Sequence, residues 1–165
     1  MKLYLAGPDV FRPDALAWAE ESRILCVAHG HVALIPLDGV ETTAIGIYQA
    51  NIELIRTADA VIANLEPFRG CEPDSGTCVE VGFALALGKP VIGYLQTTET
   101  VVERVARIEG EARENRAKKP VDRNGQHVED FGLPLNLMLA MPVRIVFGGL
   151  PEALLALAGQ DFWPK

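Results

Sequence analysis

The chain has 165 residues, of which 49% are hydrophobic, and its formal net charge is −7 at pH 7. This length and apolar content predict one compact globular domain over residues 1–165. The negative charge argues against a nucleic-acid polymer as partner, because binding a phosphate backbone needs a basic surface. A single small nucleoside is compatible with this charge.

Cysteine usage and hydropathy bear on the cellular location. Cys26, Cys71 and Cys78 are odd in number and contain no C-x-x-C pair, which fits a reducing compartment and offers no zinc knuckle. The apolar start of the chain turns to Gly7-Pro8 after a few residues, and no later apolar run approaches the roughly 20 residues of a membrane span. We therefore expect a cytoplasmic protein with no membrane span, no metal ion and no cofactor.

Strands and helices are predicted to alternate along the chain. Short apolar runs between turn residues predict strands, and apolar positions three and four apart predict helices. In the first helix, Leu16, Ala19, Ile24 and Val27 are among the residues expected to face the core. The expected strands cover residues 2–6, 31–37, 58–65, 90–95 and 142–147, and the expected helices cover residues 14–28, 42–57, 77–88, 99–114 and 151–158.

This alternation is typical of an α/β fold. We predict a single-domain, doubly wound sheet of the flavodoxin or Rossmann-like type, with five parallel strands in the order 2-1-3-4-5 and helices on both faces. In that order the first and third strands are neighbours at a topological switch point, so the loops at 7–12 and 66–77 converge. Ligands of open α/β sheets bind at such a point, and we expect the functional site there.

Residues 97–127 differ in character from the rest of the chain. Charges of both signs are dense from Glu103 to Lys119. Alternating charges are typical of a solvated helix face. We expect an exposed helix over residues 99–114 and then a mobile loop, which is a candidate cover for a pocket.

The turn before the helix at 77–88 carries two carboxylates. Asp74 precedes the helix, and Glu80 lies in its first turn on a largely apolar face. Thr77-x-x-Glu80 fits a capping box, in which Glu80 only bonds a free backbone N–H. Alternatively, carboxylates six residues apart across a turn fit an acid and nucleophile pair, and the helix dipole would favour the ionised form of Glu80.

Asn51 also has two interpretations. By helical spacing it shares one side of the helix at 42–57 with Tyr48, Ile52 and Ile55. An amide among apolar neighbours is either a satisfied core group or a pocket residue.

Four segments of the chain carry a family resemblance. They are YLAGPDVF (4–11), ADAVIANL (58–65), PDSGTCVEVGFALALGKPV (73–91) and LNLM (135–138). Together they resemble the nucleoside 2-deoxyribosyltransferase family, and the block D-x-G-T-x-x-E-x-G-x-A-x-A-x-G-K-P in the third segment is the most specific part.

The resemblance implies a pentosyltransferase of nucleotide salvage that exchanges the base of a 2′-deoxynucleoside. Glu80 would attack the anomeric carbon as nucleophile and form a covalent sugar ester, with net retention. Asp74 would act as general acid and base on the departing and incoming bases. Tyr4 would position Glu80 through a hydrogen bond.

The resemblance also implies contacts with substrates and with a second subunit. Asn136 and Met138 would be lent to the pocket of a neighbouring subunit, so we expect a homo-oligomer with shared sites. Some members carry an aspartate where Asn51 aligns, which leaves the preferred base open. Some members place their chain-terminal carboxylate in the neighbour's site, and residues 161–165 show no match for it. The expected contacts to deoxynucleosides and nucleobases are Gly7, Phe11, Asn51, Ser75, Gly76, Asn136 and Met138.

Two other functions stay open. A hydrolase of the same fold would cleave deoxynucleoside 5′-monophosphates with water as acceptor, and it would need phosphate-binding groups near Gly7 or Ser75. Arg69 could contact such a phosphate, although an exposed loop arginine without a role is the commoner case. A non-catalytic nucleotide-binding module would use Glu80 only as a helix cap.

Overall fold

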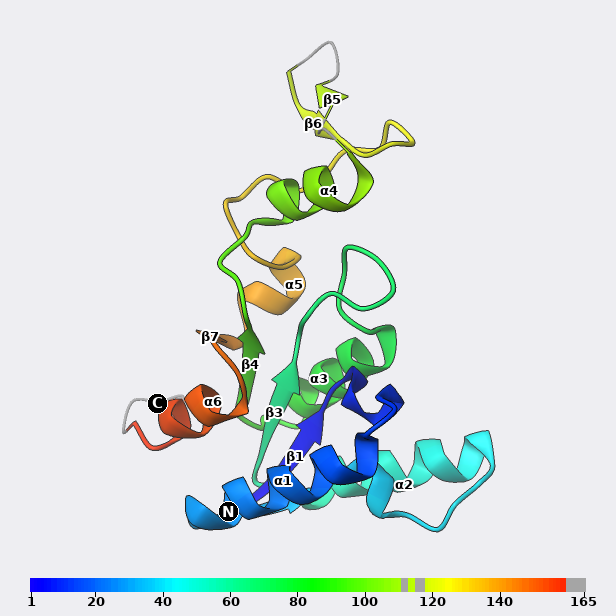
Figure 1. Cartoon of the computed structure of the whole chain (residues 1–165), viewed down its shortest axis with the longest axis vertical. Coiled ribbons are helices and arrows are strands. Elements are labelled where there is room, and N and C mark those ends of the chain that lie inside the picture. The colour runs from blue at the N-terminus through cyan, green and yellow to red at the C-terminus, as the bar shows by residue number, and fades with distance from the viewer. Residues whose placement is uncertain (111–112, 115–117, 160–165) are drawn as a thin grey trace.

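The computed structural model describes residues 1–110, 113–114 and 118–159, and at its centre lies a parallel β-sheet (Figure 1). Its five strands have the order β2-β1-β3-β4-β7, and each neighbouring pair is parallel. The strands are β1 (Lys2–Ala6), β2 (Val32–Leu34), β3 (Ala60–Asn64), β4 (Val91–Leu95) and β7 (Arg144–Phe147). Because β7 is the fifth strand of this sheet along the chain, the predicted α/β class and the order 2-1-3-4-5 are confirmed.

Helices pack on both faces of the sheet. They are α1 (Ala15–Ala28) and α6 (Leu150–Leu157) on one face and α2 (Ala44–Thr57) and α3 (Ser75–Ala86) on the other. Leu3 and Leu5 of β1 belong to the apolar cluster under the first pair, and Tyr4 and Ala6 belong to the cluster under the second. Successive strand residues point to opposite faces, so the central strand β1 supplies both halves of the core.

The inward face of α1 differs from the prediction. Leu16, Ile24 and Val27 are 77%, 62% and 67% exposed, whereas Ala19 is buried as expected. The buried residues of this helix are the small side chains Ala19, Ser22 and Cys26, and the partly buried Trp18 and Leu25 pack against the same core cluster. The face that meets the sheet is therefore turned from the predicted one, which leaves the other three predicted residues in solvent.

The second strand is shorter than predicted. β2 ends at Leu34, and Pro36–Asp38 form a 3-10 helix, η2. Pro36 has no backbone N–H to continue a strand ladder. Helix α2 then begins at Ala44, and the Thr43 side chain caps it by accepting a hydrogen bond from the Gly46 N–H. The segment between β2 and α2 therefore lies at the carboxyl edge of the sheet.

The helix predicted over residues 99–114 is shorter than predicted, and residues 113–114 belong to a strand. Helix α4 covers Val101–Glu109, begins with a capping box between Thr100 and Glu103, and ends at Gly110, whose φ is 99°. Its inner face is not solvated, since Arg104 is 1% exposed. Strands β5 (Arg113–Glu114) and β6 (Pro120–Val121) form an antiparallel pair that the sequence analysis missed, and this pair projects away from the main sheet (Figure 1).

The chain returns towards the sheet through a short helix, α5 (Leu137–Ala140), which precedes β7. The C-terminal segment discussed above, 161–165, falls outside the described residues. Within the part of the chain that the structure describes, no helix has the length and apolar character needed to cross a membrane.

Candidate active site

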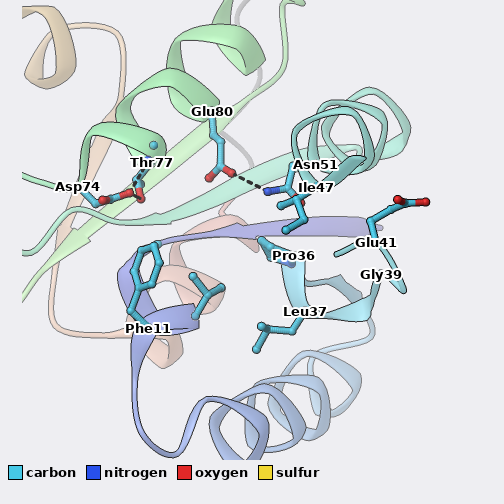
Figure 2. Close-up of a pocket in the computed structure, with 13 residues that line it drawn as sticks. Phe11, Pro36, Leu37, Gly39, Glu41, Ile47, Asn51, Asp74, Thr77 and Glu80 are labelled. Atoms are coloured by element: carbon cyan, nitrogen blue, oxygen red, sulfur yellow. Dashed lines mark hydrogen bonds between the residues drawn. The ribbon is translucent and has the colours of Figure 1, made fainter. Parts of the chain in front are cut away.

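A cavity of about 440 Å³ opens at the carboxyl ends of β1, β2 and β3 (Figure 2). This is the topological switch point at which the sequence placed the site. Helices α2 and α3 complete its walls. Its lining consists of Gly7, Val10, Phe11, Pro36, Leu37, Gly39, Glu41, Ile47, Asn51, Asp74, Gly76, Thr77 and Glu80.

Glu80 projects from α3 into this cavity, and its Oε1 is held by two neighbouring side chains. The Tyr4 hydroxyl donates a hydrogen bond of 2.7 Å to Oε1, and Asn51 Nδ2 approaches the same oxygen at 3.5 Å (Figure 2 shows the Asn51 contact). Among the residues that the structure describes, none donates a hydrogen bond to Oε2. A carboxylate held in this way is oriented and still has an oxygen for a ligand.

Asp74 caps the helix that carries Glu80. Its Oδ2 accepts hydrogen bonds from the Thr77 N–H at 2.9 Å and from the Thr77 hydroxyl at 3.2 Å. The helix consequently begins at Ser75, two residues earlier than predicted. The prediction of a capping box between Thr77 and Glu80 is wrong. Asp74 caps the helix, and the Glu80 carboxylate accepts its hydrogen bonds from Tyr4 and Asn51.

The pKa of Glu80 is raised to about 7. Burial is the main cause; the Tyr4 hydrogen bond lowers the pKa, the charge of Asp74 raises it, and the Asn51 contact lowers it. The net pKa of Glu80 is thus raised, although the helix dipole is expected to favour the ionised form. Burial and the neighbouring Glu80 raise the pKa of Tyr4, so its hydroxyl stays protonated and donates.

Asn51 is a cavity residue and not a core amide. It lies on α2 and lines the cavity opposite α3, close enough to contact Glu80 (Figure 2). Of its helix neighbours, Ile55 is buried in the core and Tyr48 is 57% exposed, so the core-facing stripe runs beside Asn51 and not through it.

The remaining predicted residues divide into two groups. Gly7, Phe11 and Gly76 line the cavity with Asn51, Asp74 and Glu80. Ser75 does not; it faces an adjacent cavity of about 410 Å³ that also borders Asp74. Asn136 and Met138 do not line the cavity of their own chain either. The Asn136 side chain caps α5 by accepting a hydrogen bond of 3.0 Å from the Met138 N–H, and Met138 is 72% exposed.

The sequence analysis missed one wall of the cavity. Pro36, Leu37, Gly39 and Glu41 follow β2, and Ile47 lies in the first turns of α2. Pro36 and Leu37 were missed because they were assigned to the strand predicted over residues 31–37. The predicted strand order could have indicated this wall. In that order the carboxyl end of β2 lies beside that of β1, so the residues after β2 lie next to the site. Val10 and Thr77 were missed as well.

Arg69 packs against aromatic rings at the cavity rim. Its guanidinium lies 4.5 Å from the ring centre of Phe68 and 5.2 Å from that of Phe11. The two rings are stacked with centres 5.5 Å apart. The backbone of Arg69 has a φ of 56°, a left-handed conformation that is uncommon outside glycine. In this arrangement the side chain makes cation–π contacts.

Over the described ranges, no group of three or more His, Cys, Asp or Glu side chains is placed to hold a metal ion.

Comparison with known proteins gives consistent relatives. A family model described as nucleoside 2-deoxyribosyltransferase matches residues 3–138. Among solved structures, a 2-desoxiribosyltransferase from Leishmania mexicana is 36% identical with a TM-score of 0.79, and the match covers 97% of this chain and 98% of that chain. A 2-deoxyribosyltransferase from Bacillus psychrosaccharolyticus is 26% identical over 57% of this chain and 72% of that chain, with a TM-score of 0.46, a likeness too weak to carry an argument.

One curated protein is also similar in sequence. It is an uncharacterised protein of Schizosaccharomyces pombe, 34% identical over 113 residues. The match covers 62% of this chain and 54% of that protein, so the chain spans about half the length of this curated relative.

Proposed function

The chain belongs to the nucleoside 2-deoxyribosyltransferase family, and we propose that it transfers the 2-deoxyribosyl group of a 2′-deoxynucleoside from one nucleobase to another. The observation that carries the proposal is the state of Glu80. One of its oxygens is fixed by Tyr4, and the other is unbonded within the described residues, in a cavity that also contains Asp74.

Glu80 acts as the nucleophile in this mechanism. Oε2 attacks the anomeric carbon as the bond to the first base breaks, and the bonding electrons leave with that base. The product is a sugar ester on Glu80. A nitrogen of the second base then attacks the same carbon, the ester bond breaks, and the carboxylate is regenerated. Two inversions give net retention at the sugar.

Asp74 handles the proton of the base. Its Oδ2 is occupied by Thr77, so the task falls to Oδ1, to which no described residue donates a hydrogen bond. A proton passed from Asp74 to the first base improves the leaving group. Asp74 regains the proton from the second base, so the proton balance over one exchange is zero.

The cavity favours an uncharged nucleoside over a 5′-monophosphate. Besides Asp74, which carries the proton for the base, it contains two carboxylates, from Glu41 and Glu80. Like charges repel, and the repulsion grows where water is excluded. The arginine that was considered as a phosphate contact, Arg69, instead stacks on Phe68 and Phe11. These observations support the transferase over the monophosphate hydrolase.

A second subunit completes the site in this proposal. Asn136 and Met138 lie outside the cavity of their own chain, and Met138 exposes 72% of its surface. A hydrophobic side chain left in solvent is suited to burial against a neighbouring copy. The protein is therefore a homo-oligomer in which each chain lends these residues to the next.

The test is base exchange by the purified protein. It is incubated with a 2′-deoxynucleoside and a different free base, and the products are separated by chromatography. A new deoxynucleoside is expected with the wild type and not with Glu80→Gln. A matched reaction without the second base measures hydrolysis. Cleavage of a 5′-monophosphate in preference to the nucleoside would instead support the hydrolase.

A further inference from the structure

Two loops that border the cavity are joined by a hydrogen-bonded polar pair, of which one member is buried. Asp9, in the turn after β1, is only 7% exposed. Its Oδ2 accepts a hydrogen bond of 2.7 Å from Nδ2 of Asn64, the last residue of β3. The Oδ1 of Asn64 accepts a hydrogen bond of 3.1 Å from the N–H of Glu66. One amide therefore holds the turn after β1 and the start of the loop after β3.

The packing around this pair is tight. A Cβ added to Gly7 would lie 2.8 Å from Asn64 Cβ and 2.9 Å from Asp9 Oδ2, closer than such atoms approach in proteins. Gly7 also lines the cavity. A shift of Asp9 or Asn64 would therefore move the cavity wall directly.

The same two loops meet again nearer the surface. Phe11, from the first loop, stacks on Phe68, from the second. Phe11 is 56% exposed, so this layer is at the rim, and the Asp9–Asn64 layer lies beneath it. The first loop supplies cavity residues 7, 10 and 11, and the second leads to Asp74. The two layers together set how far apart these cavity walls stand.

A buried carboxylate is a costly way to join two loops. Removing the charge from water opposes folding, and an apolar pair of the same size usually stabilises as well or better. The ion-pair partner of Asp9, Arg12, is half exposed, and Nη1 of Arg12 lies 3.7 Å from Oδ1 of Asp9. A hydrogen-bonded pair, however, fixes direction and distance, which an apolar contact does not.

We propose that Asp9 is a positioning residue, which holds the wall formed by residues 7–11 against Asn64 and so sets the distance across the cavity to the α3 carboxylates. Asp9 does not line the cavity and touches no reacting atom. Its effect on substrate rests on the proposed function, and its effect on the wall does not. A displacement of about 1 Å at a site away from the chemistry can cost about 10²-fold in rate.

The first test exchanges the two side chains. Asn64→Asp puts two carboxylates against each other, and is expected to lower kcat/KM for the deoxynucleoside by about 10²-fold. The double variant Asp9→Asn with Asn64→Asp restores an N–H to carboxylate bond with donor and acceptor reversed. It should recover to within about tenfold of the wild type, as coupled residues do in a double-mutant cycle. Glu20→Gln is the control, because it removes the charge of an exposed carboxylate that pairs with Arg23 on α1.

The second test separates positioning from stability. The double variant Asp9→Leu with Asn64→Leu replaces the polar pair by an apolar one. We expect it to melt at or above the wild-type temperature and yet to bind the deoxynucleoside at least tenfold more weakly, in a Glu80→Gln background where no turnover occurs. Wild-type affinity in this variant would show that the pair is only structural. This comparison stands even if Asn64→Asp does not fold.

A readout without substrate makes the proposal independent of the reaction. Amide hydrogen exchange at residues 9–11 in the unliganded protein should be faster in the apolar variant and return towards the wild-type rate in the exchanged pair. Equal exchange rates in all of these proteins would overturn the positioning role. A wild type with protected amides but no base exchange would instead overturn the proposed function alone.

Discussion

The hydroxyl of Tyr4 on β1 donates a 2.7 Å hydrogen bond to Oε1 of Glu80 on α3, across 76 positions of the chain. Tyr4 is fully buried. Burial raises the pKa of Glu80, and the hydrogen bond from Tyr4 lowers it by a smaller amount. The net pKa is about 7. Glu80 therefore changes charge near neutral pH, where a nucleophile must be ionised to react.

Replacement of Glu80 by glutamine should abolish transfer. A neutral amide cannot form the sugar ester, so we expect a loss of several orders of magnitude in the exchange rate. Glu41→Gln, the same change at another carboxylate of the cavity, should cost far less. With a slow 2-fluoro-2-deoxy sugar donor, mass spectrometry of the wild type should find the sugar on the peptide that contains Glu80. Label on Asp74 would reverse the two roles, and a fully active Glu80→Gln would leave Glu80 without a catalytic task.

The same variant should change how stability depends on pH. The pKa of Glu80 rises from an ordinary 4.5 to about 7 on folding. Between these values the folded state binds a proton that the unfolded state has released, so the wild type loses stability as pH rises, by up to about 3 kcal/mol. Glu80→Gln lacks this loss. Its melting temperature relative to the wild type should increase from pH 5 to pH 8, and a constant difference would contradict the raised pKa.

Tyr4→Phe should slow the reaction and move its pH profile. The variant loses a hydrogen bond to a charged group, worth about 1.5–3 kcal/mol, so kcat/KM should fall about 10- to 100-fold. Because that bond lowers the pKa of Glu80, the acid limb of kcat/KM should move to higher pH. Tyr48→Phe removes the hydroxyl of an exposed tyrosine that does not line the cavity, and is the control. An unshifted acid limb would argue against control of Glu80 by Tyr4.

Asn51→Asp should also raise the pH at which the enzyme becomes active. A carboxylate at this position would stand close to Glu80, and a like charge disfavours ionisation. We expect the acid limb of kcat/KM to shift upward by about one pH unit or more. Asn51→Ser, which adds no charge, is the control. The relative rates for purine and pyrimidine acceptors, measured at a pH where both proteins are fully active, should differ between the aspartate variant and the wild type.

Mixing two inactive chains should restore activity. Glu80→Ala removes the nucleophile, and Asn136→Asp removes the amide lent to the neighbour while keeping a residue that can cap α5. If each site uses Glu80 of one chain and Asn136 of the next, about one quarter of the sites in an equal mixture are intact. We expect exchange activity near this fraction after the subunits have been allowed to reassort. A mixture as inactive as its parts, or a fully active monomer by light scattering, would contradict the shared site.

Local patterns in the sequence were sufficient for the sheet. The apolar runs around 2–6, 58–65 and 90–95 predicted central parallel strands, and their alternation with helices predicted the switch point between β1 and β3. Hydrophobic periodicity is a local property of the sequence, so it can be read without knowledge of the fold. The prediction failed where periodicity was weak, as in α1, where the face that meets the sheet is not the one that carries Leu16, Ile24 and Val27.

The sequence by itself determined the order of the strands and the edge of the sheet at which Asp74 and Glu80 stand, because both follow from chain order and residue spacing. The family resemblance implied the hydrogen bond from Tyr4 to Glu80, but residue spacing did not, and the other surroundings of the two carboxylates were decided by the tertiary structure. Tyr4 and Asn51 reach Glu80 from 76 and 29 positions away, and its raised pKa depends on the burial that this packing produces. Such contacts join residues that are far apart in the sequence and form only when the chain between them folds. They cannot be read from the spacing of residues along the chain.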